Sequence, residues 1–537
     1  MRSKEIIKSI LAAFVVLLAT VFTSPKGFTA VALWISLSAA MLLIHHKSWK
    51  NFLLLWIATA VGGIIAQNDV MPIPFSLMAS LMVIGSLAGL LPFALHRWLF
   101  PRFPAPVATL IFPVFYTLFN FMIDHGPQGT WSNLAYTQYH FTSFALSASL
   151  FGLYGILFMV SWFASLVAVL FEEPARRKKM AVPAAFYLSI FLMLNAYGII
   201  RKNLRPDATE EKAGLATVVI NNNFVLETIC EDATGNKINV PPDLSFSDPI
   251  LTEIQKGQSA FLKAPAAPQF RHTRAALDSI LNLYFQKSAT MRQEGARLIL
   301  WPEGAIMAMK EDEQRYRQLA ADFARENNIT LCFSTAVFHT DKVDSGGPFI
   351  ENKLLTFGPD GSLLNEYFKN VPIMGVEPSF PGDGIIPGIS TQTGVISPAI
   401  CYDLDFPELV SQVSRHHTDL LVVPTGDWKS ISPYHTYMAA FRAIENGVSV
   451  LKAVTGGLSA YIDHNGKILA QSDYYDPHSP GIVYVNLPVT SIKTPFVLSF
   501  TIFFNVLVFG ALSFLLIPAT KGLLKLTRKV KPVPDKA

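Results

Sequence analysis

The sequence predicts an integral membrane protein in which a bundle of about eight apolar helices accompanies a water-soluble α/β domain. Apolar residues make up 51% of the 537 residues and charged residues only 15%, whereas about a quarter of a soluble protein is charged. Mean hydropathy is +0.36. The apolar surplus is concentrated at the two ends, and between about residues 214 and 487 short strands alternate with helical patterns.

Eight apolar stretches predict membrane spans, because each is close to the about 20 residues that cross a bilayer core as a helix. They cover residues 6–23, 28–46, 51–67, 74–95, 104–123, 143–171, 183–200 and 496–518. Six more spans follow the first and no tidy cleavage site does, so we expect an uncleaved first helix. We therefore divide the chain into a seven-span domain (1–205), a soluble domain (206–490), and a last span with a basic tail (491–537).

Basic residues alternate between the short loops, which predicts the orientation of the spans. They follow the second, fourth, sixth and eighth spans: Lys47, Lys50, Arg97, Arg102, Arg176, Arg177, Lys178, Lys179, Lys521, Lys525, Arg528, Lys529 and Lys531. The loops at 68–73 and 124–142 have none. The positive-inside rule then puts both termini in the cytoplasm and the soluble domain on the opposite face. Arg201, Lys202 and Arg205 run against the rule, but the cluster at 176–179 outweighs them. The net charge of +4 is too small and dispersed to indicate nucleic-acid binding.

The middle of the chain has the pattern of an α/β domain with layered sheets. We expect strands at 216–220, 297–301, 329–338, 353–357, 363–368, 420–424, 449–455 and 459–462, and helices at 273–293, 313–327 and 435–446. Gly358-Pro-Asp-Gly361 and Asp463-His-Asn-Gly466 predict hairpin turns. The stretch 228–271 has no clear period, so we expect a long surface insertion there.

Three polar residues follow predicted strands and together suggest covalent catalysis. Cys401 ends an apolar run, Glu303 follows Leu298-Ile-Leu-Trp-Pro, and Lys369 follows the strand at 363–368. A thiolate is a good nucleophile, a nearby carboxylate can take its proton, and a cation can stabilise an oxyanion. The backbone N–H of Tyr402 would offer a second oxyanion donor. These parts require no metal and no organic cofactor.

Each of the three residues also has a simpler interpretation when it is taken alone. A lone cysteine is usually buried, a lone lysine is usually a solvated surface residue, and Trp-Pro-Glu is often only a strand end. Three cysteines do not support a disulfide framework, and Cys332 lies in an apolar run typical of a buried small residue. The joint order and strand context of Glu303, Lys369 and Cys401 favour the catalytic interpretation.

This combination resembles the Glu-Lys-Cys triad of the nitrilase, or carbon–nitrogen hydrolase, superfamily. Downstream, Asp427-Trp428, Pro433-Tyr-His435, 441–447 and 450–460 resemble the motifs of apolipoprotein N-acyltransferases. Seven spans, an exported nitrilase-like domain and one last span are also that family's architecture. The loop from Trp131 to Gln138 resembles a Phe-Pro-Trp…Gln loop of the family, although its aromatic residues would also suit a membrane interface.

The resemblance implies an αββα sandwich that transfers a fatty acyl chain from a phospholipid, through a thioester on Cys401, to the N-terminal amine of a diacylglyceryl-cysteine lipoprotein. Glu303 would be the base and Lys369 the oxyanion stabiliser. The remaining implied site residues are Glu377, Tyr402 and Asp403 in support, and Trp131, Met374 and Phe406 at the substrate access. We expect a monomer in the bacterial cytoplasmic (inner) membrane, with the catalytic domain facing the periplasm or the outside.

The chain departs from the family pattern near the predicted site. The family's Leu-Val-Pro-Phe-Gly-Glu is Val371-Pro-Ile-Met-Gly-Val-Glu377 here, its Glu after Cys-Tyr is Asp403, and its Gln-Gly-Asn is Asn221-Asn-Asn223. These departures leave the three triad residues in place, but they leave open which acceptor substrate the protein uses. The alternatives are therefore a membrane-anchored amidase, an acyltransferase with another amine acceptor, and a non-catalytic membrane scaffold.

Overall fold

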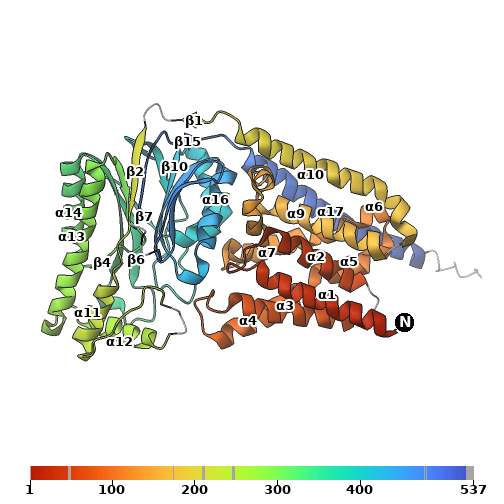
Figure 1. Ribbon diagram of the computed structural model, residues 1–537, viewed down its shortest axis with the longest axis horizontal. Helices are drawn as coiled ribbons and strands as arrows, with labels where there is room; N and C mark the ends of the chain where they lie inside the picture. The colour runs from red at the N-terminus through yellow and green to blue at the C-terminus, as the bar shows by residue number, and fades with distance from the viewer. Residues whose placement is uncertain are drawn as a thin grey trace, which may run out of the picture.

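A computed structural model describes residues 2–45, 50–172, 174–208, 212–244, 248–476, 478 and 481–527. It shows an integral membrane helical bundle joined to an αββα domain, as predicted (Figure 1). The helices of the bundle lie on one side of the molecule, and the sheets with their covering helices lie on the other.

The predicted spans are all helical. The bundle comprises α1 (Arg2–Phe22), α2 (Ala30–His45), α3 (Lys50–Gln67), α4 (Phe75–Ala88), α5 (Leu91–Leu99), α6 (Ala105–Ala108), α7 (Ile111–Asp124), α8 (Thr142–Ala145), α9 (Ala148–Glu172), α10 (Ala181–Lys202) and α17 (Phe496–Thr527). Among the described residues, seven helical segments are long and apolar enough to cross a bilayer, and Ala30–Ile44 adds a shorter apolar helix. The expectation of about eight spans is thus confirmed.

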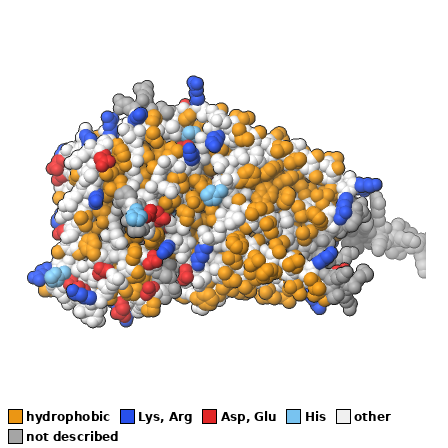
Figure 2. Space-filling view, in the orientation of Figure 1, with side chains coloured by type: hydrophobic (Ala, Val, Ile, Leu, Met, Phe, Trp, Pro, Cys, Tyr) orange, Lys and Arg blue, Asp and Glu red, His pale blue; other side chains and the backbone are white. Residues whose placement is uncertain are grey.

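The outside of the bundle is hydrophobic, as a lipid-facing surface must be. Exposed side chains include Leu192 on α10 and Phe509 on α17, and Figure 2 shows a broad hydrophobic surface over this half of the molecule. The start of α1 and the end of α17 lie at the end of the bundle remote from the sheets (Figure 1). Lys47 and the basic residues after 527 are outside the described residues.

Two sheets form the centre of the soluble domain. One has the order β14-β2-β3-β5-β6-β7, with β4 also pairing with β5, and the other has the order β13-β12-β11-β10-β9-β8. The strands are β2 (Ala213–Val218), β3 (Leu298–Leu300), β4 (Ile306–Met309), β5 (Thr330–Phe338), β6 (Ile350–Phe357), β7 (Leu363–Phe368), β8 (Ile389–Thr391), β9 (Gly394–Pro398), β10 (Leu420–Gly426), β11 (Ser449–Thr455), β12 (Leu458–Ile462), β13 (Ile468–Asp473) and β14 (Ile482–Leu487). A short pair, β1 (Asp207–Ala208) with β15 (Thr490–Ser491), lies next to the bundle.

Helices cover both outer faces of this sandwich. α11 (Asn223–Thr234), α13 (Arg271–Gln293) and α14 (Glu313–Asn327) lie on the side away from the bundle, and α12 (Ile250–Lys263) packs against α11. On the other side, α16 (Tyr434–Asn446) faces the bundle, and α15 (Pro407–Val410) packs against α16. Leu298 and Leu300 pack with Val422 and Val450 between the sheets. The apolar core therefore fixes the two sheets, and the loops at their ends, relative to each other.

Helix α16 joins the soluble domain to the bundle. Its Ala439 and Ala443 belong to the apolar core of the soluble domain, and its Met438 and Phe441 belong to the core of the membrane helices. Nearly every residue of α16 is buried, including the ion pair between Arg442 and Glu445. The two parts of the protein consequently pack as one structure rather than as units on a flexible tether.

Most of the predicted strands and helices are confirmed, but the region 228–271 is not an irregular insertion. It contains the end of α11 and all of α12, whose buried Ile254, Gly257 and Phe261 recur at helical spacing. A glycine at one of these positions interrupts the apolar stripe, which hid the helix from a search for periodic apolar residues. Sequence analysis also missed β4, β8 and β14, which are short or end the sheet.

Candidate active site

The structure brings Glu303, Lys369 and the loop of Cys401 together from both sheets. Glu303 follows β3 and Lys369 directly follows β7 in one sheet, whereas Cys401 follows β9 in the other. Because the sheets pack face to face, residues that are far apart in sequence meet where these strands end.

Lys369 is the central charge of the site. Its Nζ lies 2.8 Å from Glu303 Oε1 and 2.6 Å from Glu377 Oε2, and its side chain is 2% exposed. Burial by itself would lower the pKa of Lys369, but Glu303, Cys401 and Glu377 outweigh burial and raise that pKa well above its ordinary value. Burial alone would raise the pKa of Glu377, yet Lys369 holds it below its ordinary value. Both groups are therefore charged at neutral pH.

The Glu303 carboxylate is held by two further donors. Asn352 Nδ2 donates to Glu303 Oε1 at 2.7 Å and also to Glu377 Oε1 at 2.7 Å. The backbone N–H of Gly426 donates to Glu303 Oε2 at 2.8 Å. Neither Asn352 nor Gly426 could be predicted from the sequence as a partner of Glu303. Each is a single residue in or at the end of a strand, and its contact with a distant carboxylate depends on the fold.

Cys401 has a strained backbone conformation and lies near Glu303 and Lys369. It begins the short 3-10 helix η7 (Cys401–Asp405) with φ +47°, in the left-handed region that side chains other than glycine rarely adopt. Its Sγ lies 3.8 Å from the Gly426 carbonyl oxygen. Burial, followed by the charge of Glu303, raises the pKa of the Cys401 thiol well above its ordinary value, although Lys369 opposes the rise. The sulfur consequently rests as a thiol, and it would need a base in order to act as a nucleophile.

Tyr402 and Asp403 support the Cys401 loop through contacts with neighbouring segments. Asp403 is fully buried, and its carboxylate accepts hydrogen bonds from Tyr367 Oη, the Val371 N–H and the Ile400 N–H. Burial raises the pKa of Asp403 to about 6 against these lowering contacts. The Tyr402 hydroxyl donates to the Pro127 carbonyl at 3.0 Å, which ties this loop to the membrane part.

An apolar cavity of about 440 Å³ connects Cys401 to the membrane helices. Most of its lining is apolar: Met71, Pro72, Ile73, Leu77, Leu81, Pro127, Trp131, Ile373, Met374, Val376, Trp428 and Ile431. Its polar lining includes Gln128, Tyr402, Asp405, Asp427 and His435. Met374 is 74% exposed at one edge, and Leu77 and Leu81 on α4 are exposed on the bundle.

Two of the three predicted access residues line this cavity. Trp131 lies inside it, with its ring 6.2 Å from the ring of Trp428, and Met374 is at its edge. Phe406 instead packs edge-on against Tyr402, 5.5 Å between ring centroids, and is not among the described residues that line the cavity.

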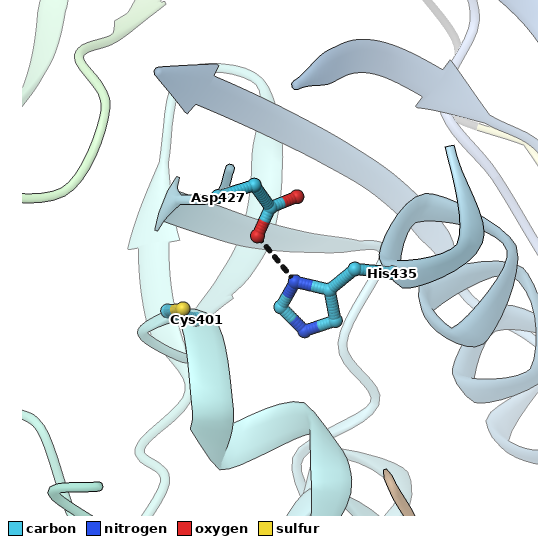
Figure 3. A group of neighbouring side chains, drawn as sticks. All are labelled: Cys401, Asp427 and His435. Atoms are coloured by element: carbon cyan, nitrogen blue, oxygen red, sulfur yellow. Dashed lines mark hydrogen bonds and ion pairs between the residues drawn. The ribbon is translucent and has the colours of Figure 1, made fainter. Parts of the chain in front are cut away.

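A second polar group lies beside the thiol (Figure 3). Atoms of Cys401, Asp427 and His435 that could bind a metal ion all lie within 4.8 Å of one another. Asp427 Oδ2 is, however, 3.4 Å from Nζ of the fully buried Lys452. A buried ammonium group so close to the carboxylate would repel a divalent cation. In the sequence, Asp427 and His435 contribute to the family resemblance, but no role could be predicted for either residue.

Comparisons with known proteins agree with this architecture. The sequence model of the carbon-nitrogen hydrolase family matches residues 264–494. An apolipoprotein N-acyltransferase of Photobacterium profundum is 28% identical over 265 residues, which cover 44% of this chain and 50% of that protein. Another, of Geobacter metallireducens, is 24% identical over 499 residues, which cover 84% of each chain.

The chain spans about half the length of the first relatives, with 46% of the Pseudomonas syringae protein matched. A solved amidase of Nesterenkonia sp. is 24% identical and has a TM-score of 0.33, covering 40% of this chain and 85% of the amidase. Residues 264–494 are thus similar to the carbon–nitrogen hydrolase family, and most of the chain is similar to apolipoprotein N-acyltransferases.

Proposed function

We propose that this protein transfers a fatty acyl chain from a phospholipid, through a thioester on Cys401, to the N-terminal amine of a diacylglyceryl-cysteine lipoprotein. The observation that carries the proposal is the apolar cavity that joins Cys401 to Leu77 and Leu81 on a membrane helix. Acyl chains dissolved in a bilayer can reach a thiol by such a route, whereas a small water-soluble amide would gain nothing from it.

The first half-reaction acylates the enzyme. The Cys401 sulfur attacks the ester carbonyl carbon of the phospholipid while Glu303 takes the thiol proton and passes it to the departing alcohol oxygen. Lys369 and the Tyr402 N–H stabilise the negative oxygen of the tetrahedral intermediate. Glu377 and Asn352 hold Lys369 and Glu303 in place through the contacts already described. A lysophospholipid leaves.

The second half-reaction acylates the acceptor. The amine nitrogen attacks the thioester carbonyl carbon, the C–S bond breaks, and an amide is formed while the Cys401 thiol is restored. Trp131 and Met374 would contact the acyl chains of the acceptor as it moves from the membrane. Phe406 would act indirectly, by packing against Tyr402, which lines the cavity. We place the catalytic domain at 206–490, between membrane parts at 1–205 and 491–537, on the periplasmic or outer face of a bacterial cytoplasmic membrane.

Mass spectrometry after incubation with phospholipid carrying a labelled acyl chain tests this function. We expect an acyl adduct on Cys401, followed by its transfer to a diacylated lipopeptide with ping-pong kinetics. Cys401→Ala should form no adduct and no product, whereas Cys332→Ala and Cys230→Ala should keep both. Activity of Cys401→Ala would contradict the mechanism. A thioester that reacts with water or another amine, but never with the lipopeptide, would contradict the acceptor.

A further inference from the structure

Next to the thiol, the cavity holds an acid–base pair that the triad does not use. His435 Nδ1 lies 2.6 Å from Asp427 Oδ1, and both side chains are at most 2% exposed (Figure 3). Asp427 is also paired with the buried Lys452. Burial would raise the pKa of Asp427, but His435 and Lys452 hold it below its ordinary value, so the carboxylate is ionised.

The hydrogen bond to Asp427 determines which nitrogen of His435 carries the proton. An ionised carboxylate only accepts hydrogen bonds, so Nδ1 is the protonated nitrogen. Burial lowers the pKa of His435 more than Asp427 raises it, which keeps the ring neutral at pH 7. The lone pair is therefore on Nε2, a buried atom without a hydrogen-bond partner within the described part of the chain. His435 lines the same cavity as Cys401.

Asp405 is the other buried group of this cavity whose side-chain oxygens have no partner among the described residues. Burial raises its pKa well above the ordinary value, more than Arg442 and Lys452 lower it. A ring nitrogen of His435 lies within 4.8 Å of the Cys401 sulfur, whereas Asp405 is not part of that group of side chains. Of the two groups, His435 is the one prepared to take a proton.

The proton balance of the second half-reaction leaves one proton that such an acceptor could take. An α-amino group has a pKa of about 7.7–8.0, so at pH 7 most of the acceptor arrives as an ammonium ion. An ammonium ion must lose two protons to become an amide nitrogen. Glu303 can return one of them to the departing Cys401 sulfur. The other must go to a second base or to water, because a carboxylate that holds one proton cannot take the next.

We propose that His435, oriented by Asp427, is this second base: Nε2 removes a proton from the acceptor ammonium ion before the neutral amine attacks the thioester. The inference rests on the proposed amine-acylating function. The N–H bond breaks as an Nε2–H bond forms, and the resulting imidazolium is stabilised by Asp427. After attack, the second proton moves from nitrogen to Glu303 and then to sulfur as the C–S bond breaks. The imidazolium proton finally passes to solvent.

Separate measurement of the two half-reactions tests this role. In His435→Gln, the amide can still hydrogen-bond to Asp427 but cannot accept a proton. We expect thioester formation within about twofold of wild type and transfer to the lipopeptide slowed by about 10²–10³. The effect should be on kcat, with the KM for lipopeptide nearly unchanged. His464→Gln, which removes another buried histidine outside the cavity, is the matched control and should leave both half-reactions at the wild-type rate.

A second acceptor distinguishes a base from a structural residue. Hydroxylamine is a weakly basic amine that is already neutral at pH 7, so it should discharge the thioester of His435→Gln about as fast as that of wild type. Equal slowing with hydroxylamine and lipopeptide, or equally slow thioester formation, would overturn the inference. If wild-type protein forms no thioester, or forms one that the lipopeptide cannot discharge, the proposed function itself fails.

Discussion

At the scale of single residues, Lys369 holds two carboxylates within one site. A buried cation that contacts both Glu303 and Glu377 makes their close approach possible, since two buried like charges would otherwise drive one of them to take up a proton. Cys401 remains protonated in the same field. The site therefore keeps the Cys401 thiol neutral while Lys369 stays charged beside it.

Replacement of Lys369 tests whether it stabilises the oxyanion or only binds substrate. Lys369→Ala should lower kcat by about 10²–10³ with little change in KM, as expected when a transition-state contact is lost. Initial rates over a range of phospholipid concentrations measure both constants. The exposed Lys256→Ala is the control. A higher KM at unchanged kcat would make Lys369 a substrate-binding residue instead.

At the scale of elements, the site depends on contact between the short helix η2 (Gly129–Ser132) of the membrane part and η7 of the soluble domain. Thr130 Oγ1 donates to the Asp405 carbonyl at 2.8 Å. Gly129 has φ +55°, and a Cβ atom there would lie 2.7 Å from the same carbonyl oxygen. Only glycine permits this approach, which places the end of the Cys401 loop against the membrane helices.

Gly129→Ala should therefore push η7 away from its place and reduce the rate of thioester formation. Gly235→Ala is the matched control, because Gly235 also has positive φ but its added Cβ would meet nothing within 4 Å. Both variants carry a backbone strain of about 1–2 kcal/mol. We expect a clear loss of thioester formation only for Gly129→Ala, measured as adduct per minute. Equal rates in the two variants would mean that this contact does not position Cys401.

A buried ion cluster connects α14 to β6 and β7 and should make stability depend on pH. Lys353 Nζ contacts Glu313, Glu351 and Glu366, and its side chain is 1% exposed. Burial alone would raise the pKa of Glu351, but its hydrogen bonds to Lys353, Lys310 and His339 lower it from 4.5 to about 2. A carboxyl group whose pKa is lowered in the folded state stabilises that state above its unfolded pKa.

We expect the stabilisation from Glu351 to be full above about pH 4.5 and to decline as the pH falls towards about 2. Glu351→Gln should be less stable than wild type at about pH 6, and the difference should shrink at about pH 3. Thermal unfolding midpoints in detergent measure this. A difference that is constant over this range would show that the ionised form of Glu351 does not stabilise the fold.

At the scale of the whole molecule, the charge pattern predicts that the two chain termini lie on the same side of the membrane. The structure places the start of α1 and the end of α17 at the same end of the helical bundle, remote from the soluble domain (Figure 1). Helix α16 packs against both cores, which fixes the catalytic loops at one membrane face. Under the proposed function, this arrangement would let substrates embedded in the bilayer reach Cys401 without crossing water.

Reporter fusions test the orientation that the positive-inside rule predicts. Fusions near residues 48, 100, 178 and 530 should report the cytoplasm, and fusions near 70, 130 and 350 should report export. Alkaline phosphatase and a fluorescent protein that folds in the cytoplasm give complementary signals. A cytoplasmic signal at 350 would put the catalytic domain on the wrong side for an exported lipoprotein.

The sequence by itself determined the spans, most of the strands and the three residues of the proposed triad. Those signals are local: a bilayer requires a continuous apolar run, and a polar residue after an apolar strand is visible without its partners. The helix α12 was not predicted from the sequence, because a glycine interrupts its apolar stripe.

Only the tertiary structure decided what surrounds the triad. Asn352 and Gly426 reach Glu303 across 49 and 123 positions of the chain, and His435 meets Cys401 only because α16 is pressed between a sheet and the membrane bundle. The lone pair of His435 Nε2 likewise depends on a hydrogen bond to Asp427. Such contacts result from the packing of two sheets and a bundle, and packing depends on side chains from the whole chain at once.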